Sequence, residues 1–264
     1  MLRGVIHTHS TYSDGEYTLR ELREVFSAAG CSFVCMTDHA EFFDDAKLRA
    51  YVSECEALSD ERFRFIPGLE YECERRMHVL GYGVTTLAGT TDPQEVIAHV
   101  EREGGVSVIA HPMDSMFEWI ETFEVLPRGV ETWNSKYDGR YGPRPGTFLL
   151  LARLRERRPD LLAFYGVDYH WKKQFRELYN LVECESPRRE DVLGALAAGR
   201  FVGVKGSLRL PATGDVPEAL LGEFGDAQTR SRRLRRLIKK TKKVADRLGL
   251  RIPAPVKAQL RRIF

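Results

Sequence analysis

Several features that identify other classes of protein are missing from this chain of 264 residues. No run of apolar residues approaches the roughly 18 that a membrane-spanning helix needs, so we expect no transmembrane segment. The five cysteines are odd in number and form no CxxC pair, which argues against a disulfide framework. No apolar segment follows Met1-Leu2-Arg3, so we expect no secretory signal. These absences predict a protein of the reducing cytoplasm.

Three widespread catalytic and nucleotide-binding motifs are also absent. The sequence contains no GxSxG nucleophile motif, no P-loop ending in GK[ST], and no GxGxxG after a predicted strand. We therefore do not expect a serine hydrolase, a P-loop nucleotidase or a dinucleotide-dependent enzyme.

The charge of the chain is unevenly distributed. The net charge is only +2 at pH 7, from 40 Lys and Arg against 38 Asp and Glu. Residues 229–264 contain 14 basic residues and one acid, whereas residues 1–228 contain 26 basic and 37 acidic residues. Such a basic segment could bind nucleic acid, lie on an anionic membrane surface, or dock on the acidic body of its own or a neighbouring chain. The sequence leaves these alternatives open, and with them the oligomeric state.

Short β-branched or aromatic runs alternate with helical segments along residues 1–205. Repeated strand–helix units imply parallel pairing with right-handed crossovers, the pattern of an α/β fold. About seven such units favour a closed or nearly closed barrel over an open sheet. Strands are predicted at 5–9, 32–37, 63–66, 77–83, 106–110, 129–133, 162–167, 179–184 and 201–204, and helices at about 18–30, 45–58, 92–104, 146–157 and 189–198.

We divide the chain into three parts on this pattern. Residues 1–205 are predicted to form the barrel, and residues 206–228, which are rich in glycine and proline, a linker. Within residues 229–264, Leu234, Leu237 and Leu248 belong to an apolar series at helical spacing. This last part is therefore predicted to be a basic amphipathic helical tail.

Six of the seven histidines and three acids fall in polar motifs beside predicted strands. In His7-Thr8-His9 the two imidazoles share one face of a strand, because side chains alternate with a period of two residues. Residues at the carboxyl ends of parallel strands meet on the side where barrels and open α/β sheets bind their ligands. The candidate metal ligands are His7, His9, Asp14, His39, Glu70, His78, His111, Asp168 and His170.

The composition of this set indicates a type of metal site. Imidazole and carboxylate without cysteine suit Zn, Mn or Fe in a hydrolytic centre. A single histidine after a strand is more often a hydrogen-bonded residue than a ligand, so the prediction depends on the combination. Nine ligands exceed the needs of one ion and would serve three divalent ions, whose residual positive charge suits a phosphate dianion. His99, in the middle of a predicted helix, is interpreted as structural.

As an ordered set, these motifs resemble those of the PHP (polymerase and histidinol phosphatase) domain family. The resemblance covers about residues 3–205 and rests on His7-x-His9, Ser13-Asp14-Gly15, Thr37-Asp38-His39, Gly68-Leu69-Glu70, His78, Ala110-His111-Pro112 and Asp168-x-His170. It implies a distorted seven-stranded (β/α) TIM-like barrel with a trinuclear metal centre and phosphoesterase activity. Asp14 stands where some relatives have histidine, a difference that bears on metal preference.

The resemblance also implies how the ligands are shared among three ions. One ion would be held by His7, His9, Glu70 and Asp168, a second by Glu70, His78 and His111, and a third by Asp14, His39 and His170.

The sequence therefore predicts an enzyme that hydrolyses a phosphomonoester of a small molecule. A metal-bound hydroxide, positioned by His7, His9, Glu70 and Asp168, would attack the phosphorus in line. Two alternatives stay open: a nuclease or oligonucleotide exonuclease of the same catalytic type that uses the basic tail as a phosphate clamp, and a metal-containing accessory module without catalysis.

Basic residues in loops that follow strands are candidates for binding the substrate. These candidates are Lys136, Arg140, Arg144, Lys205 and Arg209.

Overall fold

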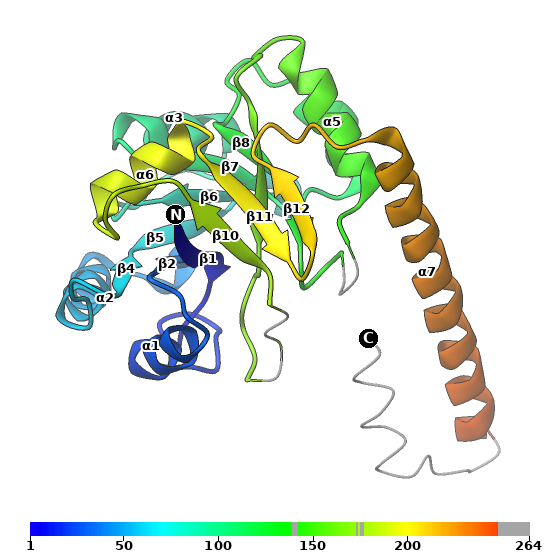
Figure 1. Ribbon diagram of the computed structural model, residues 1–264, viewed down its shortest axis with the longest axis horizontal. Helices are drawn as coiled ribbons and strands as arrows, with labels where there is room; N and C mark the ends of the chain where they lie inside the picture. Colours follow the sequence, from blue (N-terminus) through cyan, green and yellow to red (C-terminus); the bar gives the residue numbers. More distant parts are fainter. Residues whose placement is uncertain (139–141, 173, 175–176, 248–264) are drawn as a thin grey trace.

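The computed structural model describes residues 1–138, 142–172, 174 and 177–247, which form an α/β fold (Figure 1). The strands are β1 (Leu2–Thr8), β2 (Phe33–Met36), β3 (Asp38–His39), β4 (Arg64–Ile66), β5 (Gly68–Glu72), β6 (His78–Tyr82), β7 (Val106–Ala110), β8 (Gly129–Asn134), β9 (Leu162–Gly166), β10 (Tyr179–Val182), β11 (Phe201–Lys205) and β12 (Leu208–Pro211). They form two six-stranded mixed sheets, ordered β12-β11-β10-β1-β2-β4 and β3-β5-β6-β7-β8-β9.

Helices connect most of these strands. The described residues contain α1 (Leu19–Ala28), α2 (Asp45–Ala57), α3 (Pro93–Arg102), α4 (Phe117–Ile120), α5 (Pro145–Arg155), α6 (Arg189–Ala197) and α7 (Glu218–Arg247), with short 3-10 turns η1 (Ala40–Phe42), η2 (Glu74–Arg76) and η3 (Asp114–Met116). Most of the predicted strands and helices are present within a few residues of their expected positions. The elements missing from the prediction are β3, β5, β12, α4 and the 3-10 turns.

Two helices begin at capping residues at the start of their predicted ranges. Thr18 accepts a hydrogen bond from the N–H of Glu21, whose carboxylate accepts one from the N–H of Thr18, and α1 starts there. The side chain of Asp92 caps α3, and Pro93 occupies its first turn, where no backbone N–H is needed. Local capping chemistry therefore fixes where these helices start.

Strand pairing departs from the all-parallel expectation. β6 runs antiparallel to both β5 and β7, and β10, β11 and β12 also pair in antiparallel fashion. Only seven residues separate Glu70 from His78, whereas a parallel crossover needs about a dozen or more, so β5 and β6 form a hairpin through η2. As a result His78, the first residue of β6, lies opposite Ala110, the last residue of β7.

The end of β1 lies beside the segment that follows β9. The N–H of Val167 donates to the carbonyl of Ile6 (3.0 Å), and the N–H of Tyr169 donates to the carbonyl of His7 (3.2 Å). The N–H of His9 donates in turn to the carbonyl of Tyr169 (3.0 Å). Residues at the start of β1 pair instead with β10. These bonds hold the two histidine-bearing segments side by side.

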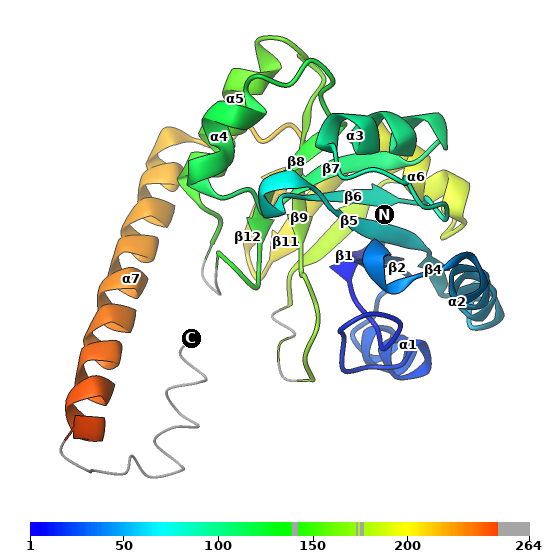
Figure 2. The ribbon, with the colours of Figure 1, turned by 180° about the vertical axis from the view of Figure 1, so that it is seen from behind.

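The segment predicted to be a linker contains β12 and the start of α7. β12 pairs with β11, and α7 begins at Glu218 rather than near residue 229. The first turns of α7 contact α5 and bury Phe224, and the rest of the helix extends away from the body (Figures 1 and 2). Residues 248–264 of the predicted tail, Leu248 among them, lie outside the described residues. No helix in the described part is both long and apolar enough to cross a membrane.

Candidate metal centre

All nine candidate ligands lie together at one place in the fold. They form four overlapping groups, within each of which one ligand atom per residue lies within 4.8 Å of the others. The groups are His9, Asp14, His39 and His170; His7, His9 and Asp168; His7, Glu70 and His111; and His39, Glu70 and His78.

Glu70 is the carboxylate at the middle of this cluster, and it lies within β5 rather than after its end. Its Oε1 is 2.7 Å from Nδ1 of His78 and 3.1 Å from Nε2 of His111. Its Oε2 is 3.1 Å from Nε2 of His9 and 3.3 Å from Nε2 of His7. Burial opposes ionisation, but the charge of His7 and hydrogen bonds from three imidazoles outweigh it and hold the pKa of Glu70 well below its usual range. Glu70 is thus ionised.

His9 is the clearest indication that this cluster binds a group other than protein side chains. Its ring is buried, and neither Nδ1 nor Nε2 satisfies hydrogen-bond geometry with a partner in the described residues, although Nε2 lies 3.1 Å from Oε2 of Glu70. Burial lowers the pKa of His9 to about 3, so the imidazole is neutral and keeps a free electron pair. Buried polar atoms are nearly always partnered, and metal ligation requires a neutral imidazole. A metal ion fits these observations.

The backbone is strained at three of the candidate ligands. His7, His111 and Asp168 have φ values of 64°, 28° and 49°, in the left-handed region that favours glycine. Each such residue costs on the order of 1–3 kcal/mol, and strain of this kind clusters at functional sites. The fold therefore holds these side chains in position at a cost to stability.

Asp14 reaches the cluster from a turn that a buried carboxylate organises. Asp38 accepts hydrogen bonds from the backbone N–H and the hydroxyl of both Ser10 and Ser13, at 2.6–3.1 Å. This places Oδ1 of Asp14 3.2 Å from Nε2 of His170. Burial opposes the shift, but the hydrogen bond and charge of His170 lower the pKa of Asp14 to about 2. The turn therefore brings Asp14 to the other candidate ligands.

Glu131 is a buried residue of the site that the sequence analysis missed. Its Oε1 is 2.8 Å from Nδ1 of His7, and its Oε2 accepts hydrogen bonds from the backbone N–H of His111 (2.9 Å) and Nδ2 of Asn134 (2.8 Å). Asn134 also donates to Asp168 (3.0 Å). One carboxylate therefore contacts the ring of His7 directly, the backbone of His111, and Asp168 through Asn134, a supporting role that often accompanies metal-binding histidines. The only signal in the sequence was an acid inside the strand predicted at 129–133.

Among the predicted substrate residues that the structure describes, Lys136 lies closest to the cluster. Its Nζ is 3.2 Å from Oδ1 of Asp168 and 3.3 Å from both ring nitrogens of His170, so it lies over the face of that ring. The same ammonium is 5.2 Å from the ring centres of Tyr137 and Trp171.

The other predicted substrate residues are placed differently. Arg144 contacts Asp138 (2.5 Å), Asp114 (3.2 Å) and the carbonyl of Pro112 (2.7 Å), and it lines a cavity beside the cluster. Lys205 lies over the ring of Trp133, and Arg209 is exposed on β12. Arg140 lies outside the described residues.

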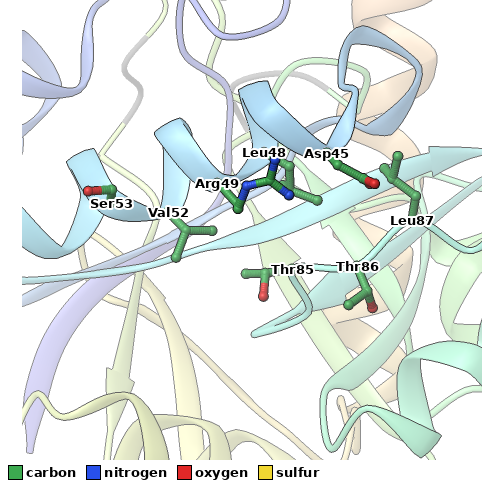
Figure 3. Close-up of a pocket in the computed structure, with 8 residues that line it drawn as sticks. All are labelled: Asp45, Leu48, Arg49, Val52, Ser53, Thr85, Thr86 and Leu87. Atoms are coloured by element: carbon green, nitrogen blue, oxygen red, sulfur yellow. The ribbon is translucent and has the colours of Figure 1, made fainter.

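A cavity of about 530 Å³ opens beside one flank of the cluster. His39, His78 and His111 lie in its wall, together with Met77, Met113, Met116 and Tyr137. A second hollow of about 580 Å³ lies elsewhere, where α2 faces the segment after β6 (Figure 3). Its walls include Asp45 and Arg49 but none of the nine candidate ligands, so this hollow does not adjoin the metal centre.

Comparison with known proteins connects this geometry to a family. The family model described as PHP domain matches residues 6–247. The DNA polymerase/3'-5' exonuclease PolX of Bacillus subtilis (strain 168) is 32% identical over 79 residues, which cover 27% of this chain. The match spans only 14% of that relative's own length.

Solved structures of similar fold are distant in sequence. A two-domain protein from Bacteroides vulgatus ATCC 8482, described as containing a predicted PHP-like metal-dependent phosphoesterase, matches with a TM-score of 0.55 at 16% identity, over 85% of this chain and 69% of that one. PsfC from Pseudomonas syringae PB-5123 matches with a TM-score of 0.52 at 15% identity, over 87% of this chain and 99% of that one. At these identities the likeness establishes the fold alone.

Proposed function

Because the chain belongs to the PHP domain family, we propose that it is a metal-dependent phosphoesterase that hydrolyses a phosphomonoester of a small molecule. The observation that carries this proposal is the convergence of nine imidazole and carboxylate side chains around the buried, unpartnered His9. This donor set suits divalent Zn, Mn or Fe, since it contains nitrogen and oxygen ligands and no thiolate.

Three ions account for the whole ligand set. His7, His9, Glu70 and Asp168 would hold the first, and Glu70, His78 and His111 the second. Asp14, His39 and His170 would hold the third, with His9 beside them. The overlap of the four ligand groups at His7, His9, His39 and Glu70 supports shared rather than separate sites.

The bound ions would supply the positive charge that lowers the pKa of water and neutralises phosphoryl oxygens. The side chains of the protein hold the reacting groups in position, and phosphoryl transfer depends largely on such positioning. His7, His9, Glu70 and Asp168 fix the reacting end of the substrate, and Glu131 fixes the ring of His7. The ammonium of Lys136, beside Asp168 and His170, is placed to bind a phosphoryl oxygen. Arg144, Lys205, Arg209 and Arg140 are the further candidates for contacts with the substrate.

We also infer that the strands around this site wrap as a distorted seven-membered barrel. The seven members are β1, β2 with β3, β4 with β5, β6, β7, β8 and β9. The hydrogen bonds between the end of β1 and residues 167–169 support this closure, because they join the first member to the last. A barrel would explain why residues from seven segments of the chain meet at one end.

A nuclease or oligonucleotide exonuclease of the same catalytic type is the second candidate. The local similarity to PolX and the run of basic residues in α7 favour it. In that case α7 would bind the phosphates of a strand, and removal of residues 229–264 would abolish activity on oligonucleotides.

The test is an assay of the protein, in the presence of Mn²⁺ or Zn²⁺, against p-nitrophenyl phosphate, mononucleotides and short oligonucleotides. We expect hydrolysis of phosphomonoesters, and we expect His9→Ala and Asp168→Ala to abolish it and to reduce the amount of bound metal. His99→Ala is the matched control, because His99 lies on α3, hydrogen-bonded to Thr86. Equal damage from His99→Ala would mean that the site is misassigned. Full metal content without turnover on any of these substrates would favour an accessory module.

A further inference from the structure

Three aromatic side chains are exposed in the described part of the chain, and all three lie against imidazoles of the metal centre. Other exposed large apolar residues there are aliphatic. Phe42 is 46% exposed, with its ring centre 6.2 Å from that of His39; Tyr137 is 55% exposed and 4.7 Å from His111; and Trp171 is 48% exposed and 5.6 Å from His170. We refer to Phe42, Tyr137 and Trp171 as the aromatic collar.

Packing does not explain this arrangement. The collar residues come from three separate connections, after β3, β8 and β9. Large aromatic surfaces gain most from burial, and the chain buries most of its others. Exposed apolar groups that gather at the mouth of a polar site are typical of ligand contact.

Tyr137 is the member of the collar that also lines the cavity beside His78 and His111. The rest of the apolar wall there is formed by Met77, Met113 and Met116, whose flexible thioethers adapt to flat surfaces. A volume of about 530 Å³ is far larger than a phosphate needs and falls in the range of organic ligands. The cavity therefore has room for the alcohol part of a phosphoester.

We propose that Tyr137, with the methionine wall, forms a leaving-group subsite that selects phosphoesters whose alcohol carries a planar ring. Tyr137 is the specificity-determining residue, because a ring stacked on its exposed face would lie in the cavity while the phosphate lies at the cluster. This inference rests on the proposed phosphoesterase function and specifies its substrate.

The test compares two substrates with the same ester chemistry. AMP and ribose 5-phosphate are both primary alkyl phosphates, and only AMP carries a planar ring. For the wild type we expect kcat/KM for AMP to exceed that for ribose 5-phosphate by on the order of tenfold, the effect of one stacked base. Tyr137→Ala should remove most of this ratio, whereas Tyr137→Phe should keep it.

Leu149→Ala is the matched control, because Leu149 is as exposed as Tyr137 (55%) but lies on α5 and does not line the cavity. Its substrate ratio should equal that of the wild type. An equal kcat/KM for the two substrates in the wild type would overturn the subsite. So would an equal loss on both substrates in Tyr137→Ala, because that result indicates a merely structural role.

Failure of the proposed function would look different from failure of the subsite. If no phosphomonoester is hydrolysed, calorimetric titration of the Mn²⁺-loaded protein with AMP and with ribose 5-phosphate tests the subsite by itself. Tighter binding of AMP that is lost in Tyr137→Ala would support it, and equal affinity would overturn it. Activity on ribose 5-phosphate equal to that on AMP would leave the phosphoesterase in place and remove the subsite alone.

Discussion

Replacing Glu131 by Gln tests whether the metal centre depends on a residue that is itself no ligand. The substitution keeps the size of the side chain and removes one charge from a position with no solvent exposure. Glu131 accepts hydrogen bonds from three donors, at His7, His111 and Asn134, whereas a glutamine offers only one acceptor oxygen. At least one of these donors would then face an NH₂ group.

The structure sets the size of the expected effect. A buried donor left without an acceptor costs roughly 1–3 kcal/mol, so the free energy of unfolding should fall by about that amount. Loss of an orienting carboxylate behind a metal-bound histidine lowers metal affinity by roughly 10- to 100-fold. We expect Glu131→Gln to show both effects, in chelator-competition titrations with Zn²⁺ or Mn²⁺ and in urea unfolding.

Glu121→Gln is the control for this experiment, because Glu121 pairs with Arg153 on the surface. It should change metal affinity by less than twofold. A Glu131→Gln protein that is less stable but binds metal as tightly as the wild type would refute the orienting role. In that case Glu131 would only fill space behind His7.

Four further outcomes are expected. Gly166→Ala should destabilise the protein by about 1–3 kcal/mol in urea unfolding, because an ideal Cβ there would lie 1.7 Å from Oε1 of Glu131; an unchanged midpoint would contradict this packing. Lys136→Ala should raise KM for phosphomonoesters while bound metal, measured by elemental analysis, stays the same; loss of metal would place Lys136 in the ion site instead. Removing metal with a chelator should lower the Tm, because ions that bind only the folded state stabilise it, and an unchanged Tm would argue against a preformed centre. Burial raises the pKa of Asp138 to about 6, although the charge of Arg144 opposes the shift. Between about pH 3.8 and 6 the folded state therefore binds more protons than the unfolded state, so the free energy of unfolding should fall as the pH rises through this window. Asp138→Asn should remove this fall, as measured by urea unfolding at several pH values.

The sequence was sufficient to find the candidate ligands because polar residues interrupt apolar strands at their ends. His39 and His111 lie at or directly after short buried strands. The rings of His7 and His9 lie with their centres 5.3 Å apart, although the left-handed backbone at His7 interrupts the regular alternation of the strand. These are local patterns, so they can be read without knowing which strands are neighbours. Their use as ligands stays a prediction until metal is measured.

The parts that the sequence analysis missed depend on contacts between distant segments. Glu131 binds a histidine 124 positions away, and nothing near it in the chain marks that partner. The direction of β6, in contrast, was recoverable, because the connection from Glu70 to His78 is too short for a crossover. Asp38 also stood inside a recognised motif, but its bonds to Ser10 and Ser13 exist only once two strands pair.

The reversed direction of β6 has a consequence for how this scaffold can diversify. The turn between β5 and β6 both begins and ends at the mouth of the metal centre, next to Glu72 and His78. Lengthening it would add a roof over the pocket without moving any ligand, and the entropy of a longer loop grows only slowly with its length. A longer turn between β5 and β6 would therefore be enough to restrict the size of the substrate, while the candidate metal ligands stay unchanged.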